Sequence, residues 1–175
     1  MPTPLPDDAD SELQVLRDQL LALATASASL LGSPVVEDVL AATVKLARDV
    51  FAADGYAVWR YGAGGPWRIV QSHGVSDAFA ARVIAVNAGR PGPATVTFAE
   101  PMLFEDVSAS PLIAELADAY RDEGIRSMIV FPLQIGDRRS ATLVFYFRSP
   151  RVFRELDVRV GGALASVASA AITTA

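Results

Sequence analysis

Two neighbouring strand-like runs near the end of the chain constrain its fold more than any other feature. They read SMIVFPLQI (127–135) and SATLVFYF (140–147), and the short GDRR link between them predicts a β-hairpin. Both runs are apolar at nearly every position, whereas a strand with one solvated face alternates apolar and polar residues. The sheet that contains them must therefore be covered on both faces.

A second hairpin is predicted earlier in the chain. YAVWRY (56–61) and WRIVQS (67–72) are rich in aromatic and β-branched residues and flank the segment GAGGP. GAGGP lacks the Lys-Ser/Thr ending of a phosphate-binding loop and lies between strands, so we interpret it as a turn. Two hairpins predict an antiparallel sheet.

Helix signals surround these hairpins. Ser33-Pro34 begins a predicted helix that ends at Gly55, and Ser110-Pro111 begins another that ends at Gly124. A short helix is expected over 77–87, and a last helix runs from about 154, with Gly161-Gly162 inside it as a sign of close packing.

The order of these elements predicts an α+β fold with α/β/α layers. We expect the helices at 34–54 and 154–175 to cover one face of the sheet. The irregular middle of the chain and the helix at 111–123 then cover the other face. An irregular cover over an apolar sheet commonly leaves a ligand cavity.

The N-terminal region is expected to be separate from this domain. Residues 1–10 are rich in Pro and Asp and predict a disordered tail, and residues 11–32 predict a separate helix, a candidate for dimerisation, that precedes a folded domain at 33–175. Leucines follow the spacing of a coiled-coil seam at Leu13, Leu16, Leu20, Leu23 and Leu30. Two interpretations remain open: a seam between two copies of the chain, or an amphipathic helix that lies on its own domain.

Composition excludes several classes of chemistry. The chain has no cysteine and one histidine, His73, so thiolate catalysis, disulfides, iron–sulfur clusters and multi-histidine metal sites within one chain are impossible. The net charge of −5, without a basic cluster, argues against nucleic-acid binding. No apolar run approaches the roughly 18 residues of a membrane span, and the N-terminus has no secretory signal, so we expect a cytoplasmic protein.

Residues 120–132, YRDEGIRSMIVFP, place a phenol, carboxylates, guanidinium groups and Ser127 close together. A nucleophile needs a base, and the single histidine is far away in sequence. We interpret this segment as a helix that stops at Gly124 and a strand that begins near Ser127. We therefore expect no catalytic residues and no enzyme activity.

At this point the sequence resembles the GAF family of sensory domains. The resembling segments are GIRSMIVFPL with AELADAYRDE before it and GDRRSATLVFYF after it, together with PMLFED and VFRELD, and they extend over roughly residues 30–172. The resemblance implies an antiparallel sheet between two helical layers, with a small-molecule pocket under the irregular cover. Such domains usually occur in sensor kinases, phosphodiesterases, cyclases or transcription regulators, and pass a ligand or dimerisation signal to a neighbouring domain.

The known ligands of the family can be compared with this chain. Bilin photoreceptors usually attach their chromophore to cysteine, and the methionine-sulfoxide reductase branch uses catalytic cysteines, so both chemistries are excluded here. Cyclic-nucleotide-binding members carry Asn-Lys, then Phe, three residues and Asp-Glu. Phe153 and Asp157 keep that spacing, but Phe147-Arg148 replaces Asn-Lys and Val158 replaces Glu. We therefore interpret Phe153 as a core residue and Asp157 as an acid near a helix N-terminus.

Haem is a further possibility, because some family members bind it through a histidine. His73 follows the second strand near the mouth of the expected pocket, which makes it the candidate axial ligand. A single histidine on a loop is more often a solvated or hydrogen-bonded residue, so haem is not the cofactor we expect.

Strand alternation and the resemblance together predict the pocket wall. The candidate ligand-binding residues are Ala57, Trp59, Tyr61, Phe104, Tyr120, Met128, Val130, Thr142, Val144 and Tyr146. Ile129, Phe131, Leu143 and Phe145 then face the helices on the other side. A pocket of this kind suits a flat or apolar small molecule and does not suit a phosphate.

Three functions follow from these observations, and the third and least favoured is a haem-binding gas or redox sensor that uses His73. The first is a sensor that binds an unknown small molecule and signals, as a homodimer, to an output domain such as a kinase in bacterial two-component signalling. The alternative is a ligand-free dimerisation or scaffold domain whose own side chains fill the pocket.

Overall fold

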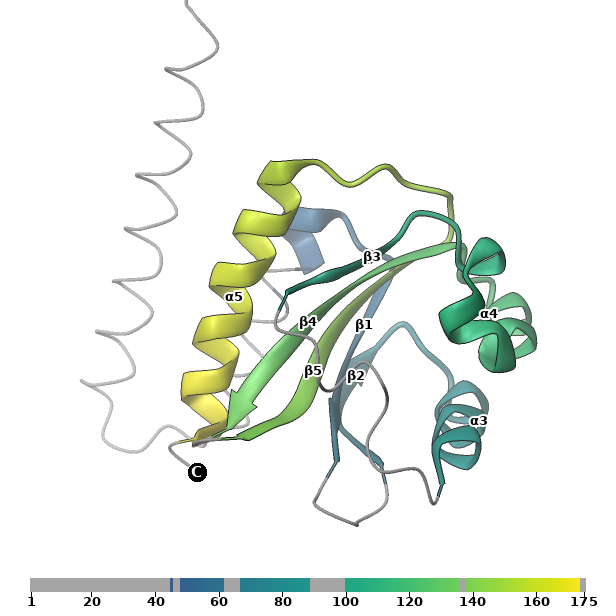
Figure 1. The fold of residues 1–175 in the computed structure, drawn as a ribbon, viewed down its shortest axis with the longest axis horizontal. Helices are drawn as coiled ribbons and strands as arrows, with labels where there is room; N and C mark the ends of the chain where they lie inside the picture. Colours follow the sequence, from purple (N-terminus) through teal and green to yellow (C-terminus); the bar gives the residue numbers. More distant parts are fainter. Residues whose placement is uncertain (1–44, 46–47, 62–66, 89–99, 136–137, 174–175) are drawn as a thin grey trace, which may run out of the picture.

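A five-stranded antiparallel sheet forms the centre of the molecule (Figure 1). The computed structural model describes residues 45, 48–61, 67–88, 100–135 and 138–173. The strands follow the spatial order β2-β1-β5-β4-β3, and their bounds are Gly55–Arg60 (β1), Arg68–His73 (β2), Met102–Phe104 (β3), Ser127–Ile135 (β4) and Arg138–Phe147 (β5). The expectations for the tail, the leucine helix, most of the helix at 34–54 and the GAGGP turn lie outside the described residues.

The two predicted hairpins form the two halves of this sheet. β1 pairs with β2, β4 pairs with β5, and β1 and β5 join the halves, with Trp59 opposite Thr142. β3 pairs with β4 only from Met102 to Phe104, opposite Val130 to Met128. Pro132, which has no N–H to donate, lies beyond this short pairing and is therefore tolerated in β4.

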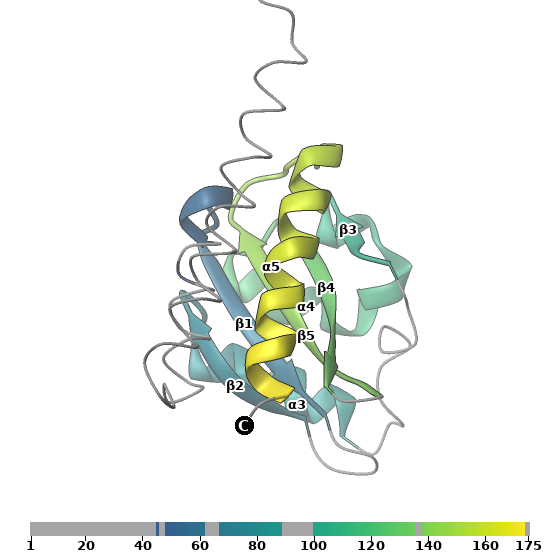
Figure 2. The same cartoon turned by 90° about the vertical axis from the view of Figure 1, so that its left-hand side faces the viewer.

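Helix α5 (Glu155–Thr173) covers one face of the sheet, as Figure 2 shows from the side of that helix. It packs on a core in which Phe131, Phe145 and Leu143 are fully buried. At Gly161 the helix meets the ring of Phe131 so closely that a Cβ atom would overlap the ring, whereas a Cβ atom at Gly162 would have no neighbour within 4 Å. The predicted close packing is thus confirmed for Gly161 and is wrong for Gly162.

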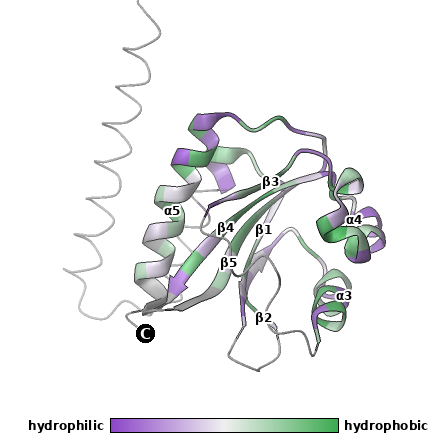
Figure 3. Cartoon of the chain, in the orientation of Figure 1, coloured by the Kyte–Doolittle hydropathy of each residue, from purple (hydrophilic) through white to green (hydrophobic). Residues whose placement is uncertain are grey.

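The opposite face is covered by short helical segments. This layer consists of the helices α3 (Asp77–Asn87) and α4 (Ala117–Glu123) and of the 3₁₀ segments η2 (Val107–Ala109) and η3 (Pro111–Leu116). Hydrophobic residues run along β4 and β5 between the two helical layers (Figure 3). α4 ends at Gly124, whose φ of 77° is left-handed, so the predicted stop is confirmed. The α/β/α arrangement is confirmed as well.

The end of the helix before β1 differs from the prediction. Gly55 was expected to terminate that helix, but it is the first residue of β1. The left-handed position is Ala52, with φ of 49°, and Ala52 is the one non-glycine residue of the described chain that has a positive φ. The chain must change direction between the end of the helix and the start of β1, and Ala52 makes this change in a left-handed conformation that glycine adopts more easily.

No helix in the described part of the chain combines the length and the apolar character that are needed to cross a membrane.

Candidate functional site

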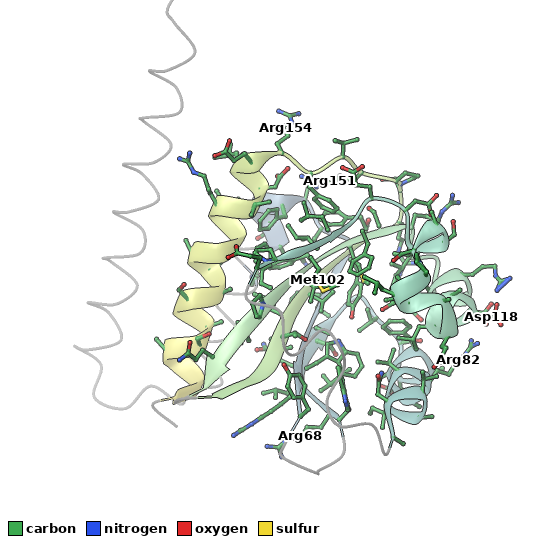
Figure 4. All side chains as sticks on the ribbon, viewed as in Figure 1. Arg68, Arg82, Met102, Asp118, Arg151 and Arg154 are labelled. Carbon is green, nitrogen blue, oxygen red and sulfur yellow. The ribbon has the colours of Figure 1, made fainter. Side chains whose placement is uncertain are left out.

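An aromatic cluster fills the space between the sheet and the layer of α3 and α4. Trp59 and Tyr61 come from β1 and the residue after it, Trp67 precedes β2, Phe79 lies on α3 and Tyr120 on α4, and Tyr146 lies on β5. Smaller apolar residues complete the cluster, among them Met102, which is labelled in Figure 4. Large side chains from every surrounding element thus meet on one face of the sheet.

The rings of this cluster touch in two groups. Phe79 lies 5.6 Å from Tyr120 and 5.7 Å from Tyr146 between ring centroids, the second pair edge-to-face. Trp67 lies 5.1 Å from Tyr61 and 5.9 Å from Trp59. These are the separations that aromatic pairs prefer. The first group joins the sheet to α3 and α4, and the second lies at the β1–β2 end of the sheet.

Hydrogen bonds join the two groups and anchor one of them to the backbone. Trp59 Nε1 donates to the Tyr146 hydroxyl at 3.0 Å, and the Tyr61 hydroxyl donates to the carbonyl of Ala141 at 3.2 Å. Burial raises the pKa of Tyr146 well above its ordinary value, with a further contribution from Tyr120 nearby, and burial also raises the pKa of Tyr120 and Tyr61. All three phenols are therefore neutral hydrogen-bonding groups at physiological pH.

Trp67 differs from Trp59 in its hydrogen bonding. Its Nε1 atom is buried and has no hydrogen-bond partner within the described structure. The other buried polar side-chain atom of this kind, Gln71 Oε1, belongs to a residue opposite Val58, on the α5 side of the sheet. Within the aromatic cluster the Trp67 indole N–H is thus a buried donor that has no acceptor among the described residues.

The cover over the cluster is fixed along one edge. The Glu123 carboxylate, at the end of α4, accepts from the backbone N–H of Ser76 at 2.7 Å and from its hydroxyl at 2.6 Å. Ser76 in turn caps α3 by accepting from Phe79 N. Arg148 donates to the carbonyl oxygens of Glu123 and Gly74. These bonds tie the start of α3 to the end of α4 and to the end of β5.

The charged residues of this layer point away from the cluster. Arg82 of α3 pairs with Asp122 of α4 at 2.5 Å, and both side chains are largely exposed. Figure 4 shows Arg82 and Asp118 on the outer side of the helices, away from the sheet. In the described residues, the buried polar side chains are Asn87, Ser127 and Thr142, and none of them is charged. The face toward the sheet is therefore apolar and uncharged.

The predicted site residues come together on this face. Ala57, Trp59, Tyr61, Phe104, Tyr120, Met128, Val130, Val144 and Tyr146 all belong to the cluster, and Thr142 is buried opposite Trp59. Ile129, Phe131, Leu143 and Phe145 belong to the core under α5, as the alternation predicted. Whether these residues bind a ligand remains a prediction.

Sequence reasoning missed Trp67, Phe79, Val83 and Asn87. Phe79, Val83 and Asn87 are the buried residues of α3 and follow one another at four-residue intervals, which is the spacing of one helix face. Trp67 could have been found from the predicted hairpin, because Tyr61 and Trp67 are the last and first residues of its two strand-like runs, and their rings lie 5.1 Å apart.

His73 does not join this face. It lies opposite Tyr56, a residue of the core under α5, and its ring stacks on Tyr56 with centroids 6.1 Å apart. Its Nε2 atom is 2.8 Å from Arg48 Nη1 and acts as the acceptor, because a guanidinium group can only donate. The expectation that His73 lies at the mouth of the pocket, where it could be an axial haem ligand, is therefore wrong.

Ser127, Phe153 and Asp157 have structural roles, as predicted. The Ser127 hydroxyl donates to the carbonyl of Ser149 at 2.8 Å, and Phe153 is buried under α5. The Asp157 carboxylate accepts from Arg154 N at the start of α5 and from Arg151. Figure 4 shows Arg151 and Arg154 on the connection that leads into α5. No group of three or more potential metal ligands occurs in the part of the chain that the structure describes.

The sequence profile of the GAF domain matches residues 35–172 of the chain. No match is found among curated proteins.

Solved structures with the same fold come from sensory proteins. One is a domain assigned to a two-component sensor histidine kinase protein of Sinorhizobium meliloti 1021, at 21% identity and a TM-score of 0.69, covering 80% of this chain and 92% of that one. Another is the phycoerythrobilin-bound GAF domain of a cyanobacterial phytochrome, at 14% identity and a TM-score of 0.74, covering 92% and 96%. A third is the GAF domain of PixJ from Thermosynechococcus elongatus in its blue-light-absorbing form, at 17% identity and a TM-score of 0.66, covering 79% and 85%.

Proposed function

The chain belongs to the GAF domain family, and on this basis we propose that it is a sensor module without catalysis of its own, which binds a small, flat or apolar molecule between the sheet and the α3–α4 layer. The observation that carries this proposal is the aromatic cluster, which holds α3 and α4 on the sheet through large, uncharged side chains. Ligand pockets are mostly apolar, with a small number of placed polar groups, and this face has that composition.

The contrast between the two helical layers supports a ligand on this side. α5 approaches β4 so closely that Gly161 cannot carry a side chain, and small residues such as Ala165 and Ala168 are buried beside it. α3 and α4 instead contact the sheet through the rings of Phe79 and Tyr120, and we propose that these rings move when a ligand enters. A ligand on this side then displaces side chains, whereas a ligand under α5 would have to separate the helix backbone from Phe131.

We further propose that the signal leaves the domain through its terminal helices, in a homodimer. The support is the leucine spacing at Leu13, Leu16, Leu20, Leu23 and Leu30, together with the position of α5 on the strands that line the ligand face. Replacing Leu16 and Leu20 with Asp should convert a dimer into a monomer in multi-angle light scattering. An unchanged mass contradicts the dimer, and the matched change of the exposed Leu112 to Asp should leave the mass unaltered.

The proposed setting is bacterial signal transduction, with a kinase or another output domain as the partner. The likeness to a sensor histidine kinase domain of Sinorhizobium meliloti supports this setting. The test is to sequence the gene that encodes this chain. A kinase or cyclase domain encoded in the same polypeptide supports a role in signal transduction, and an unrelated enzyme in that polypeptide contradicts it.

Strand alternation gives a direct test of the ligand face. In a methyl NMR spectrum, an uncharged aromatic compound that raises the melting temperature should shift the methyl signals of Val130 and Val144, which face α3 and α4. The signals of Ile129 and Leu143, their neighbours in sequence, face α5 and should move much less. Equal shifts on both faces, or shifts of Ile129 and Leu143 alone, contradict the proposed site.

The second candidate is a scaffold domain in which the cluster is a finished core. The observation that favours it is the burial of Trp59, Tyr120 and Tyr146, which are packed with Phe79 and leave at most 5% of each side chain exposed. The methyl experiment separates the two functions. A scaffold gives no stabilisation and no shift with any compound of a screen, whereas its dimer mass stays intact.

A further inference from the structure

The Trp67 indole is the starting point for an inference about the chemistry of the ligand. Trp67 is 8% exposed, its Nε1 atom is buried, and no acceptor for that atom occurs within the described residues. A buried N–H without a partner costs about 1–3 kcal/mol, so such groups are rare and call for a physical reason. A ligand that supplies the missing acceptor is such a reason.

Two other donors of the cluster already have acceptors. The Trp59 indole donates to the Tyr146 hydroxyl, and the Tyr61 hydroxyl donates to the backbone carbonyl of Ala141. The Trp67 ring packs against the rings of Trp59 and Tyr61. A molecule that enters the cluster at this end of the sheet therefore finds aromatic faces to stack on and, beside them, the buried Trp67 N–H that has no acceptor among the described residues.

The charges around the site select the kind of acceptor. None of the buried side chains in the described chain carries a charge. A carboxylate or phosphate taken into this face would lose its hydration, and no buried cation among the described residues would compensate for that loss. The acceptor should therefore be neutral, such as a carbonyl oxygen or an aromatic ring nitrogen.

Resting on the proposed function, we infer that the ligand is a flat, uncharged aromatic or heteroaromatic molecule that accepts a hydrogen bond from Trp67 Nε1 at its edge. Trp59 and Tyr61 provide the stacking surface next to that bond. Trp67 is then the residue that distinguishes ligands with an edge acceptor from hydrocarbons of the same shape.

The experiment uses two probes of the same shape, naphthalene and quinoline, which differ by one ring nitrogen. The chain has two tryptophans, so its ¹H–¹⁵N spectrum contains two indole signals, and the variant Trp67→Phe assigns them. Quinoline should bind about threefold to tenfold more tightly than naphthalene, the range of one neutral hydrogen bond. Quinoline should also move the Trp67 indole proton downfield, whereas the Trp59 indole, already bonded to Tyr146, should move much less.

Two controls sharpen the test. In Trp67→Phe quinoline should lose its advantage and bind no more tightly than naphthalene, because its ring nitrogen then loses its hydration without gaining a donor. 2-Naphthoate, which adds a negative charge, should bind no more tightly than naphthalene, and tighter binding overturns the inference that the ligand is uncharged. If the variant does not fold, the indole signals of the unaltered protein decide the question.

The remaining outcomes separate the inference from the proposed function. Equal affinities for naphthalene and quinoline, with an unmoved Trp67 indole signal, overturn the role of Trp67 and leave the ligand site intact. A nuclear Overhauser effect between a buried water and the Trp67 indole proton that persists with quinoline bound also overturns the role of Trp67, because the water and not the ligand is then the acceptor. If none of the three probes shifts a signal of the cluster, the proposed site fails, and the inference fails with it.

Discussion

Gly161 marks the place where α5 and β4 are closest. A Cβ atom there would overlap the ring of Phe131, which is fully buried and cannot move without disturbing the core. We therefore predict that Gly161→Ala lowers the free energy of unfolding by about 1–3 kcal/mol, the usual cost of an overpacked core. Urea denaturation followed by far-UV circular dichroism measures this change.

Gly162 provides the matched control one residue later in the same helix. Alanine at this position meets no neighbour and favours the helix, so Gly162→Ala should raise stability by about 0.5–1 kcal/mol. If both substitutions stabilise the protein, the close approach of α5 to Phe131 is wrong.

Single residues also show where sequence reasoning succeeds and where it stops. Alternation predicted that Met128 and Ile129 lie on opposite faces, and β4 keeps this alternation from Ser127 to Leu133. Which of the two faces α3 and α4 came only from the family resemblance, because both faces of the strand are apolar. In β2, however, Val58 pairs with Gln71 and Trp59 with Ile69, so Val70 is an extra residue. This bulge reverses the alternation, and His73 faces α5 although Ile69 faces α3 and α4. No turn residue or pattern in WRIVQSH predicts the bulge, because its position depends on pairing with β1.

At the scale of elements, the bonds between Ser76 and Glu123 decide how firmly α3 is held. Glu123→Ala removes both acceptors of Ser76, the N-cap residue of α3, one for its backbone N–H and one for its hydroxyl. We predict a loss of about 0.5–1.5 kcal/mol in the stability of this layer. Hydrogen exchange should quicken in α3 and leave the amides of β4 and β5 unchanged.

Arg82→Ala is the control for this change. It breaks the other link between the same two helices, the pair of Arg82 with Asp122, which is exposed and is expected to contribute little. Exchange in α3 should therefore change much less than in Glu123→Ala. An equal effect of both variants would mean that the two helices are held by charge and not by the cap.

The elements themselves were largely predictable, and their spatial arrangement was less so. The two hairpins, the helix at 77–87 and the stop at Gly124 follow from local signals. That α3 belongs to the ligand-side layer does not, because its apolar residues occur on all sides of the helix and its packing depends on Phe79 meeting Tyr120 and Tyr146. The end of the helix before β1 was misplaced for a related reason: Ala52 takes the left-handed conformation that only tertiary contacts can impose.

At the scale of the whole molecule, the buried phenols make the fold sensitive to alkali. Burial raises the pKa of Tyr120 and Tyr146 in the folded state, whereas in the unfolded chain they ionise near their ordinary pKa of about 10. Their contribution is therefore complete below about pH 10 and is lost as the pH rises toward the folded-state values. As the pH rises between the unfolded-state and folded-state pKa values, each of these two tyrosines should lower the free energy of unfolding by about 1.4 kcal/mol per pH unit.

Absorbance of tyrosinate at 295 nm, compared with far-UV circular dichroism, checks this. The signal of these residues should appear together with unfolding, and Tyr120→Phe should reduce the pH slope of stability by one proton. Full ionisation of all tyrosines near pH 10 in a protein that keeps its circular dichroism would contradict the burial of the cluster.

The strict alternation along β4 and β5 has an evolutionary consequence. The even-numbered side chains face α3 and α4, as in Met128, Val130, Val144 and Tyr146. The odd-numbered side chains pack against α5, as in Ile129, Phe131, Leu143 and Phe145. Descendants of this chain can therefore alter the even positions by substitution, and acquire a new binding preference, while the packing of α5 is inherited unchanged. A one-residue insertion or deletion in either strand would exchange the two sets of side chains, so homologues should differ in these strands by substitution and keep their lengths.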